Sequence, residues 1–253
     1  MTSRYGRLDR LLARQLVISR AQVRPLLASG RVLLNDRAAR HADVRVGPFD
    51  SVSVDGAVLQ QGMARRYLML HKPAGIVSAT SDPQHRTVMD LVRDSRFAAM
   101  ADALHIAGRL DATSTGLMLL TNDGQWSRTL CDPANGLAKY YRVDLARPVT
   151  EADVRAFADG MAFPYEGITT RPAGLQPLPG CRARVTLVEG RYHQVRGMFA
   201  RCGNQVLALH REAIGPWPLP DDLLPGQVRA LADPEQLFHA AARPYPDTGA
   251  HEQ

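Results

Sequence analysis

The stretch GRLDATSTGLMLL, residues 108–120, runs from a polar, glycine-bounded turn straight into an apolar strand expected over residues 117–120. A turn that enters a buried strand is held rigidly at the strand end, where enzymes often carry their working side chains. Asp111 is the acidic residue of this turn and therefore a candidate catalytic carboxylate. Taken alone, an aspartate among Thr, Ser and Gly more often makes local turn hydrogen bonds, so the interpretation depends on the segments around it.

Two other segments contain residues that could act with Asp111. In EGRYHQVRGMF, residues 189–199, a strand ends in a tight turn and a helix begins, with Arg196 on the exposed helix face. A fixed arginine beside a carboxylate favours the ionised form by charge attraction, although an arbitrary helix arginine is more often simply solvated. KPAG, residues 72–75, is a strand end followed by a turn, and alone it indicates only a loop.

The segment KYYRV, residues 139–143, is expected to be a strand on which Lys139 and Tyr141 share one face. An aromatic side chain on an inward strand face could stack on a base that has left its helix. Tyr141 could equally be core packing, with its hydroxyl satisfied at the edge. The residues alone leave both interpretations open.

Positive charge is concentrated in the N-terminal quarter. The chain has a formal net charge of +6, and residues 1–60 hold ten arginines against five aspartates, nearly the whole excess. Lys72 and Lys139 are the only lysines. Arginine bonds phosphate oxygens in pairs and stacks on bases, which favours RNA binding. A GC-rich genome that encodes Arg in place of Lys is the alternative explanation.

Residues 1–60 predict a small basic domain. An amphipathic helix is expected over residues 7–17, and Ser19 with Gln22 forms a capping box for a second helix that ends at Gly30. Pro25 lies inside that helix and predicts a kink or a short helix. Short strands are expected over residues 32–34, 43–46 and 51–54, with residues 57–66 as the connection to the next domain.

Residues 67–242 predict a larger domain, because apolar strands alternate there with turn clusters and helices. Strands are expected over residues 67–71, 117–120, 140–145, 183–188 and 205–211. Helices are expected over residues 150–159, 192–201 and 236–242. The polar tail, residues 243–253, is expected to be disordered.

Several classes of protein are disfavoured. The three cysteines, Cys131, Cys181 and Cys202, lie far apart without zinc-ligand spacing, so neither a disulfide framework nor a metal site is indicated. No apolar run approaches ~18 residues, and the arginine-rich first 24 residues lack a signal-peptide core. We therefore expect a cytoplasmic protein without a membrane span, and no cofactor.

Taken together and in this order, the four motifs resemble the pseudouridine synthase family, in the RsuA branch that acts on small-subunit ribosomal RNA. The matching elements are KPAG at residues 72–75, GRLDATSTGL at residues 108–117, KYYRV at residues 139–143 and EGRYHQVRGMF at residues 189–199. Residues 7–56 resemble the S4-type RNA-binding domain of that branch, and the whole resemblance spans residues 7–231. It implies an α+β fold, with a small S4-like domain followed by a mixed, mainly antiparallel sheet.

The resemblance also implies roles for matching residues. Asp111 corresponds to the essential aspartate, Tyr141 to the aromatic residue that packs on the target base, and Arg196 to the basic partner of the aspartate. Arg109 resembles the arginine that helps displace the target nucleotide. Gly197 stands where the branch often has a second basic residue, so that RNA contact is absent. Further RNA contacts are expected from Lys72, Lys139, His193, Arg7, Arg20, Arg24 and Arg31.

The implied function is isomerisation of one uridine in 16S ribosomal RNA. The base would be flipped from its stack, its N1–C1′ bond broken in a step that depends on Asp111, and the uracil rejoined through C5. The expected partner is ribosomal RNA in a partly assembled small subunit, bound by a monomer. Two alternatives stay open: a 23S ribosomal RNA or tRNA substrate, or a non-catalytic RNA-binding factor in ribosome assembly.

Overall fold

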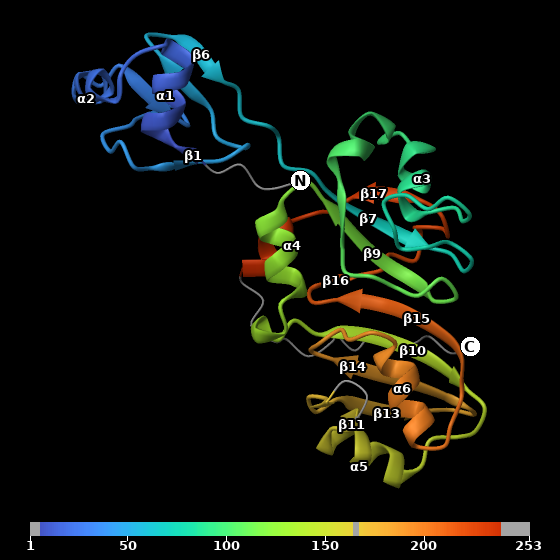
Figure 1. Ribbon diagram of the computed structural model, residues 1–253. Coiled ribbons are helices and arrows are strands. Elements are labelled where there is room, and N and C mark those ends of the chain that lie inside the picture. The colour runs from blue at the N-terminus through green and yellow to red at the C-terminus, as the bar shows by residue number, and fades with distance from the viewer. Residues whose placement is uncertain (1–5, 164–166, 239–253) are drawn as a thin grey trace. The chain divides into compact units, whose positions relative to one another are not determined.

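The computed structural model describes residues 6–163 and 167–238. The chain divides into two compact units, Met1–Arg65 and Arg66–Gln253 (Figure 1). The tail expected to be disordered, residues 243–253, and the last part of the expected helix over residues 236–242 lie outside the described residues. Within the described residues, no helix combines the length and the apolar character that a bilayer span requires.

The first unit begins with the two expected helices, α1 (Leu8–Leu16) and α2 (Arg20–Ala28). The leucines of α1 recur at helical spacing, and this face forms the core of the unit against α2 and the strands. The predicted capping box is confirmed: the Ser19 hydroxyl accepts the Gln22 backbone N–H, and the Gln22 side chain accepts that of Ser19. Pro25 does not end α2, which is nine residues long.

A four-stranded antiparallel sheet follows in the order β3-β2-β5-β6. Its strands are β2 (Val32–Leu34), β3 (Arg37–Ala38), β5 (Val52–Val54) and β6 (Ala57–Gln60), and a separate pair joins β1 (Gly6–Arg7) to β4 (Arg45–Val46). The Asn35-Asp36 turn closes a tight hairpin, with positive φ at both residues. The expectation that residues 57–66 only connect the domains was wrong in its first part, because β6 pairs with β5.

Val17, which ends α1, adopts a left-handed conformation with φ 55° and ψ 45°, and it is 90 % exposed. This conformation is costly for a β-branched residue, whereas glycine adopts it freely. Val17→Gly should therefore stabilise the unit by about 0.5–1 kcal/mol, since the relieved strain exceeds the extra chain entropy of glycine. Thermal unfolding and amide exchange in α1 would measure the change. Val58→Gly, at an exposed strand position, should instead destabilise it.

The second unit is built on a sheet in the order β13-β14-β10-β15-β9-β7-β17, with β8 and β16 paired at its side. The strands are β7 (Tyr67–Lys72), β8 (His105–Ala107), β9 (Thr115–Thr121), β10 (Lys139–Leu145), β13 (Gly174–Leu178), β14 (Arg182–Leu187), β15 (Val206–Ile214), β16 (Trp217–Pro218) and β17 (Val228–Ala230). A two-stranded hairpin joins β11 (Ala162–Phe163) to β12 (Ile168–Thr169). All five expected strands are present, and the mainly antiparallel α+β fold is confirmed.

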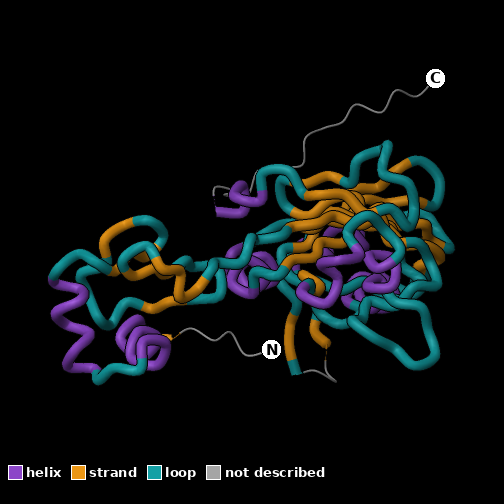
Figure 2. The backbone as a smooth tube through the Cα atoms, turned by 90° about the horizontal axis from the view of Figure 1, so that it is seen from above, coloured by secondary structure: helices purple, strands orange, loops and turns teal. Residues whose placement is uncertain are grey.

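Helices pack on both faces of this sheet. Along β7 and β9 alternate residues enter different cores: Leu70 and Met118 pack in the core with α3, α5 and α6, whereas Leu117 and Leu119 pack with α4. The helices are α3 (Val88–Arg93), α4 (Gly124–Cys131), α5 (Glu151–Asp159) and α6 (Gln194–Arg201), with 3-10 turns η1 (Ala98–Ala103), η2 (Pro133–Asn135) and η4 (Pro234–Phe238). Figure 2 shows the strands running side by side with helical segments beside them.

One parallel pairing in the middle of the sheet fixes the loop that precedes β9. β9 and β15 pair in parallel, with Gly116 opposite Arg211. Gly116 has φ +112°, and a Cβ there would lie 2.3 Å from the Arg211 carbonyl oxygen, so only glycine permits this close approach. The loop over residues 108–116 therefore leads into β9, a central strand of the sheet.

Candidate active site

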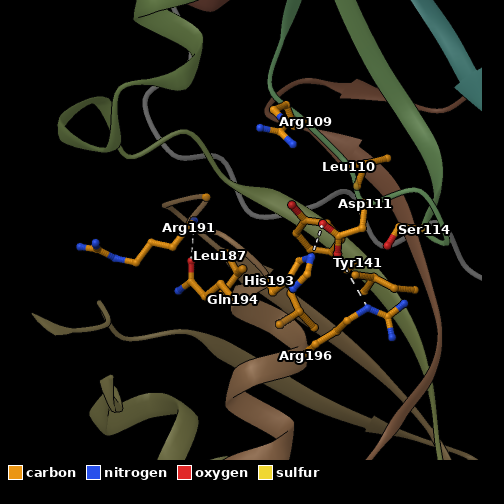
Figure 3. A pocket seen from close by; sticks show the side chains of 13 residues that line it. Arg109, Leu110, Asp111, Ser114, Tyr141, Leu187, Arg191, His193, Gln194 and Arg196 are labelled. Carbon is orange, nitrogen blue, oxygen red and sulfur yellow. Dashed lines mark hydrogen bonds and ion pairs between the residues drawn. The ribbon is translucent and has the colours of Figure 1, made fainter. Parts of the chain in front are cut away.

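A pocket opens between the loop before β9 and the turn that leads into α6 (Figure 3). The loop supplies Arg109 and Asp111, β10 supplies Tyr141, and the α6 segment supplies His193 and Arg196. The structure thus brings together five of the residues singled out in the sequence. In the close-up, Arg109 lies apart from the others, on the side away from α6.

Asp111 lies between two nitrogen-bearing side chains from the α6 segment. His193 Nε2 is 3.2 Å from Asp111 Oδ1, and Arg196 Nε is 3.8 Å from Asp111 Oδ2. Arg196 is itself fixed, because it donates to the Val206 carbonyl at 3.0 Å and to the Thr113 hydroxyl at 3.2 Å. The Asp111 side chain stays 27 % exposed, so a ligand in the pocket can reach it.

Tyr141 is only 6 % exposed and packs in the core cluster while also lining the pocket. Its neighbours across the sheet are Val185 on β14 and Arg211 on β15. The two interpretations of this residue are therefore compatible, since one part of the ring packs in the core and another borders the pocket.

The segment KPAG holds the Asp111 loop in place by hydrogen bonds to main-chain carbonyl groups. The Lys72 ammonium donates to the carbonyl groups of Ala112 and Ser114, at 3.0 and 2.7 Å, and to that of Pro73 at 3.0 Å. The Gly75 backbone N–H donates to the Ala112 carbonyl at 2.8 Å. KPAG thus has a structural role in the site that its sequence alone did not reveal.

Both lysines are buried, with 0 % exposure at Lys72 and 6 % at Lys139. This corrects the expectation that they contact RNA directly, because each ammonium group donates to main-chain carbonyls inside the protein. Burial lowers the pKa of Lys72 from 10.5 to about 8, partly offset by the nearby Asp111 charge. Burial, with the Arg211 charge, also lowers the pKa of Lys139.

Arg211 is a further residue of this site that sequence reasoning missed. It is 2 % exposed, and its guanidinium bridges the two ends of the loop, donating to the Leu117 carbonyl at 2.7 Å and to the Arg109 carbonyl at 3.2 Å. A buried arginine with carbonyl partners gives no local pattern in the sequence. Only the pairing of β15 with β9 places the Arg211 guanidinium next to the Asp111 loop.

The turn before α6 is organised by Glu189, a carboxylate with 2 % exposure. It accepts hydrogen bonds from the Arg171 backbone N–H at 2.9 Å, the Gln194 side chain at 2.7 Å and the Arg191 Nε at 3.1 Å. This network supports His193 in a left-handed conformation, with φ 48° and ψ 27°. The conformation turns the imidazole toward Asp111.

The departure at Gly197 has a packing explanation. A Cβ at this position would lie 2.7 Å from the Phe163 ring, so the ring covers the helix backbone where the RsuA branch often carries a basic side chain. The Arg201 guanidinium lies over the same ring, 5.2 Å from its centroid. Phe163 and Gly197 therefore fit as a pair.

In the first unit, the four arginines expected on RNA are all exposed. Arg7 and Arg20 both pair with Asp9, at 3.2 and 3.4 Å, and Arg31 pairs with Asp55. Arg24 lies on the exposed side of α2. A separate hollow in this unit is lined by Arg7 together with two arginines of α1 that the sequence did not single out, Arg10 and Arg14. Across the residues that the structure describes, no group of three or more His, Cys, Asp or Glu side chains could hold a metal ion.

A basic module followed by a sheet that presents a carboxylate to a pocket is an arrangement typical of an enzyme that acts on RNA. Residues 66–201 match the family model described as RNA pseudouridylate synthase, and residues 6–52 match the S4 domain. The chain therefore belongs to the RNA pseudouridylate synthase family, whose members convert uridine to pseudouridine in RNA.

Known relatives agree with this assignment. The Pseudomonas aeruginosa protein named ribosomal small subunit pseudouridine synthase A is 48 % identical over 226 residues, which cover 89 % of this chain and 96 % of the relative. The Escherichia coli protein of the same name is 42 % identical, with coverages of 90 % and 97 %. A crystal structure of a pseudouridylate synthase is 35 % identical, covers 91 % of this chain and 99 % of its own, and superposes with a TM-score of 0.65.

Proposed function

We propose that this protein isomerises one uridine of small-subunit 16S ribosomal RNA to pseudouridine. The observation that carries the proposal is the Asp111 carboxylate, which is open to the pocket and lies 3.2 Å from His193 and 3.8 Å from Arg196. The choice of ribosomal RNA rests on relatives that cover nearly the whole chain and are named for the small subunit.

Asp111 would act on the sugar of a uridine flipped into the pocket. The reaction breaks the N1–C1′ bond, turns the freed uracil and forms a bond from C5 to C1′, with the C5 proton released and a proton returned to N1. The carboxylate can serve by attacking C1′ or by removing a sugar proton. The positive charge of Arg196, 3.8 Å away, favours the anion that either route requires.

Two other residues would manage the base. Tyr141 lines the pocket while most of its side chain is packed in the core, so the part of the ring that borders the pocket would contact the uracil from a fixed position. Arg109 is exposed at the far side of the pocket and can occupy the space that the flipped nucleotide leaves. Flipping costs a few kcal/mol in a duplex and less in an open loop.

A direct test is tritium release from 5-tritiated uridine in RNA, since only exchange at C5 liberates the label. Small-subunit particles and naked 16S RNA from cells lacking the protein should release tritium with the wild-type chain. Release only from 23S RNA or tRNA would assign the target uridine to that RNA. Release from none of these RNAs would favour a non-catalytic assembly factor. Mapping pseudouridines in those cells would identify the uridine.

We also propose that the first unit, with residues 61–66 as the link, supplies phosphate contacts before chemistry. Deleting residues 1–60 should raise KM about tenfold or more while kcat changes far less, because phosphate contacts add affinity without touching the reacting atoms. The difference in KM should shrink as salt is raised, because salt weakens the phosphate contacts that only the full-length protein makes. Equal kinetics with and without the module on assembled subunits would contradict this role.

The catalytic unit over residues 67–242 carries the reaction in this proposal. We further propose that the protein works as a monomer, because a single chain contributes all the residues around Asp111. Its place of action would be the cytoplasm, where ribosomal RNA is assembled. Sedimentation of the protein bound to small-subunit RNA would measure the stoichiometry.

A further inference from the structure

One exposed aromatic ring lies next to a residue that lines the pocket, and it has no role in the proposed reaction. Tyr192 is 70 % exposed, and it is the only exposed Phe, Tyr or Trp among the residues whose burial the structure describes. A tyrosine ring has an apolar face on which a base can stack and a polar hydroxyl that tolerates water. Tyr192 therefore has a free surface beside the site.

The ring is held parallel to the imidazole of His193. The two centroids are 3.9 Å apart and the planes are inclined by 19°. His193 in turn offers Nε2 to Asp111 at 3.2 Å. The imidazole of His193 therefore contacts Asp111 through Nε2 and Tyr192 through one face, so Tyr192 adjoins a residue that lines the pocket.

The support under this pair is rigid. Gln194 accepts the Arg191 backbone N–H at 3.1 Å and donates to the buried carboxylate of Glu189 at 2.7 Å. These bonds hold the backbone of the turn on both sides of Tyr192. A preorganised ring loses little conformational freedom when a ligand stacks on it.

The charge around the ring suits a nucleic acid strand. Arg191 uses its Nε on Glu189, and its side chain stays 37 % exposed, so the outer guanidinium nitrogens face solvent. Arg109, also exposed, lines the same pocket. An exposed ring next to an arginine, beside a pocket with a second exposed arginine, is an arrangement by which proteins bind single-stranded nucleotides.

We propose that Tyr192 is a stacking subsite for the base of the nucleotide adjacent to the target uridine. This rests on the proposed function, because the target itself is assigned to the pocket between Asp111 and Tyr141. Tyr192 does not line that pocket, so its ring meets the next base along the strand. Stacking is sequence-tolerant, since every base has a π-face.

The test uses synthetic RNA that contains the mapped target uridine, with 2-aminopurine in turn at each flanking position. Stacking on the ring should quench 2-aminopurine at one of them when wild-type protein binds. Tyr192→Phe should quench equally, and Tyr192→Ala should not. In tritium release, Tyr192→Ala should raise KM about tenfold with kcat nearly unchanged. Leu224→Ala, which also removes an exposed apolar side chain, should leave KM unaltered.

Equal quenching by the wild-type protein and Tyr192→Ala would overturn the subsite. So would a fall in kcat with unchanged KM, because the ring would then act only by supporting His193. An abasic residue at the quenched position gives a matched check. It should weaken RNA binding by the wild-type protein and leave RNA binding by Tyr192→Ala unchanged. Absence of tritium release by the wild type would count against the proposed function, while the quenching would still decide the subsite.

Discussion

Asp111→Asn should abolish pseudouridine formation while leaving RNA binding nearly unchanged. Asparagine keeps the shape of the side chain but removes the negative charge, and an amide neither attacks C1′ nor accepts a sugar proton. Removing a group of this kind typically costs at least about 1,000-fold in kcat. Tritium release from ribosomal RNA would measure the loss, and filter binding would measure RNA affinity.

The matched control is Asp102→Asn, because the Asp102 side chain is 94 % exposed and lies outside the pocket, with a 3.4 Å contact to Arg93. This variant should keep wild-type turnover, which shows that the loss follows from position 111 and not from one negative charge fewer. Substantial turnover by Asp111→Asn would remove the carboxylate from the mechanism. Weak RNA binding by Asp111→Asn would instead indicate that the loop had lost its shape.

The sequence was most informative where a local pattern determines structure. The capping box at Ser19 and Gln22 and the alternation in residues 67–71 and 140–145 each correspond to an element observed within a residue or two. Short elements escaped. α3 has six residues and α4 eight, too few turns for a clear helical period, and β6 follows a turn in a segment without alternation.

The residues of the site show the same contrast between what the sequence predicts and what only the fold determines. The pairing of Asp111 with Arg196 could be expected, because the family resemblance implies it, and the structure places the groups 3.8 Å apart. His193 could not be placed, since its contact with Asp111 depends on a left-handed φ of 48°. A lysine in a sequence suggests a solvated charge. The burial of Lys72 could not be predicted, because the carbonyl groups that accept its hydrogen bonds lie some forty residues later in the chain.

Lys72→Met should lower kcat by about 10- to 100-fold with a much smaller change in KM. Methionine fills a similar volume, but the carbonyl groups of Ala112 and Ser114 lose the ammonium that joins them, so the Asp111 loop is held less firmly. The Ala112 carbonyl keeps its hydrogen bond from the Gly75 N–H. A displacement of about 1 Å in a catalytic group can cost about 100-fold. Lys139→Met is the matched control, because that buried lysine donates to the Leu137 carbonyl and not to the Asp111 loop.

The pH dependence separates this effect from unfolding. Burial holds the pKa of Lys72 at about 8, below its usual 10.5, so between these values the unfolded chain keeps a proton that the folded chain has released. The contribution of this group to stability therefore rises as pH increases from about 8 to 10.5.

The value of kcat should fall over the pH range in which the contribution of Lys72 to stability rises. The ammonium has three N–H donors for its three carbonyl partners, whereas the neutral amine has two, so kcat should fall with a midpoint near pH 8 while the protein remains folded. Lys72→Met should lack this alkaline decline, and Lys139→Met should retain it. An unchanged alkaline decline in Lys72→Met would assign the titration to another group, because a methionine cannot lose a proton.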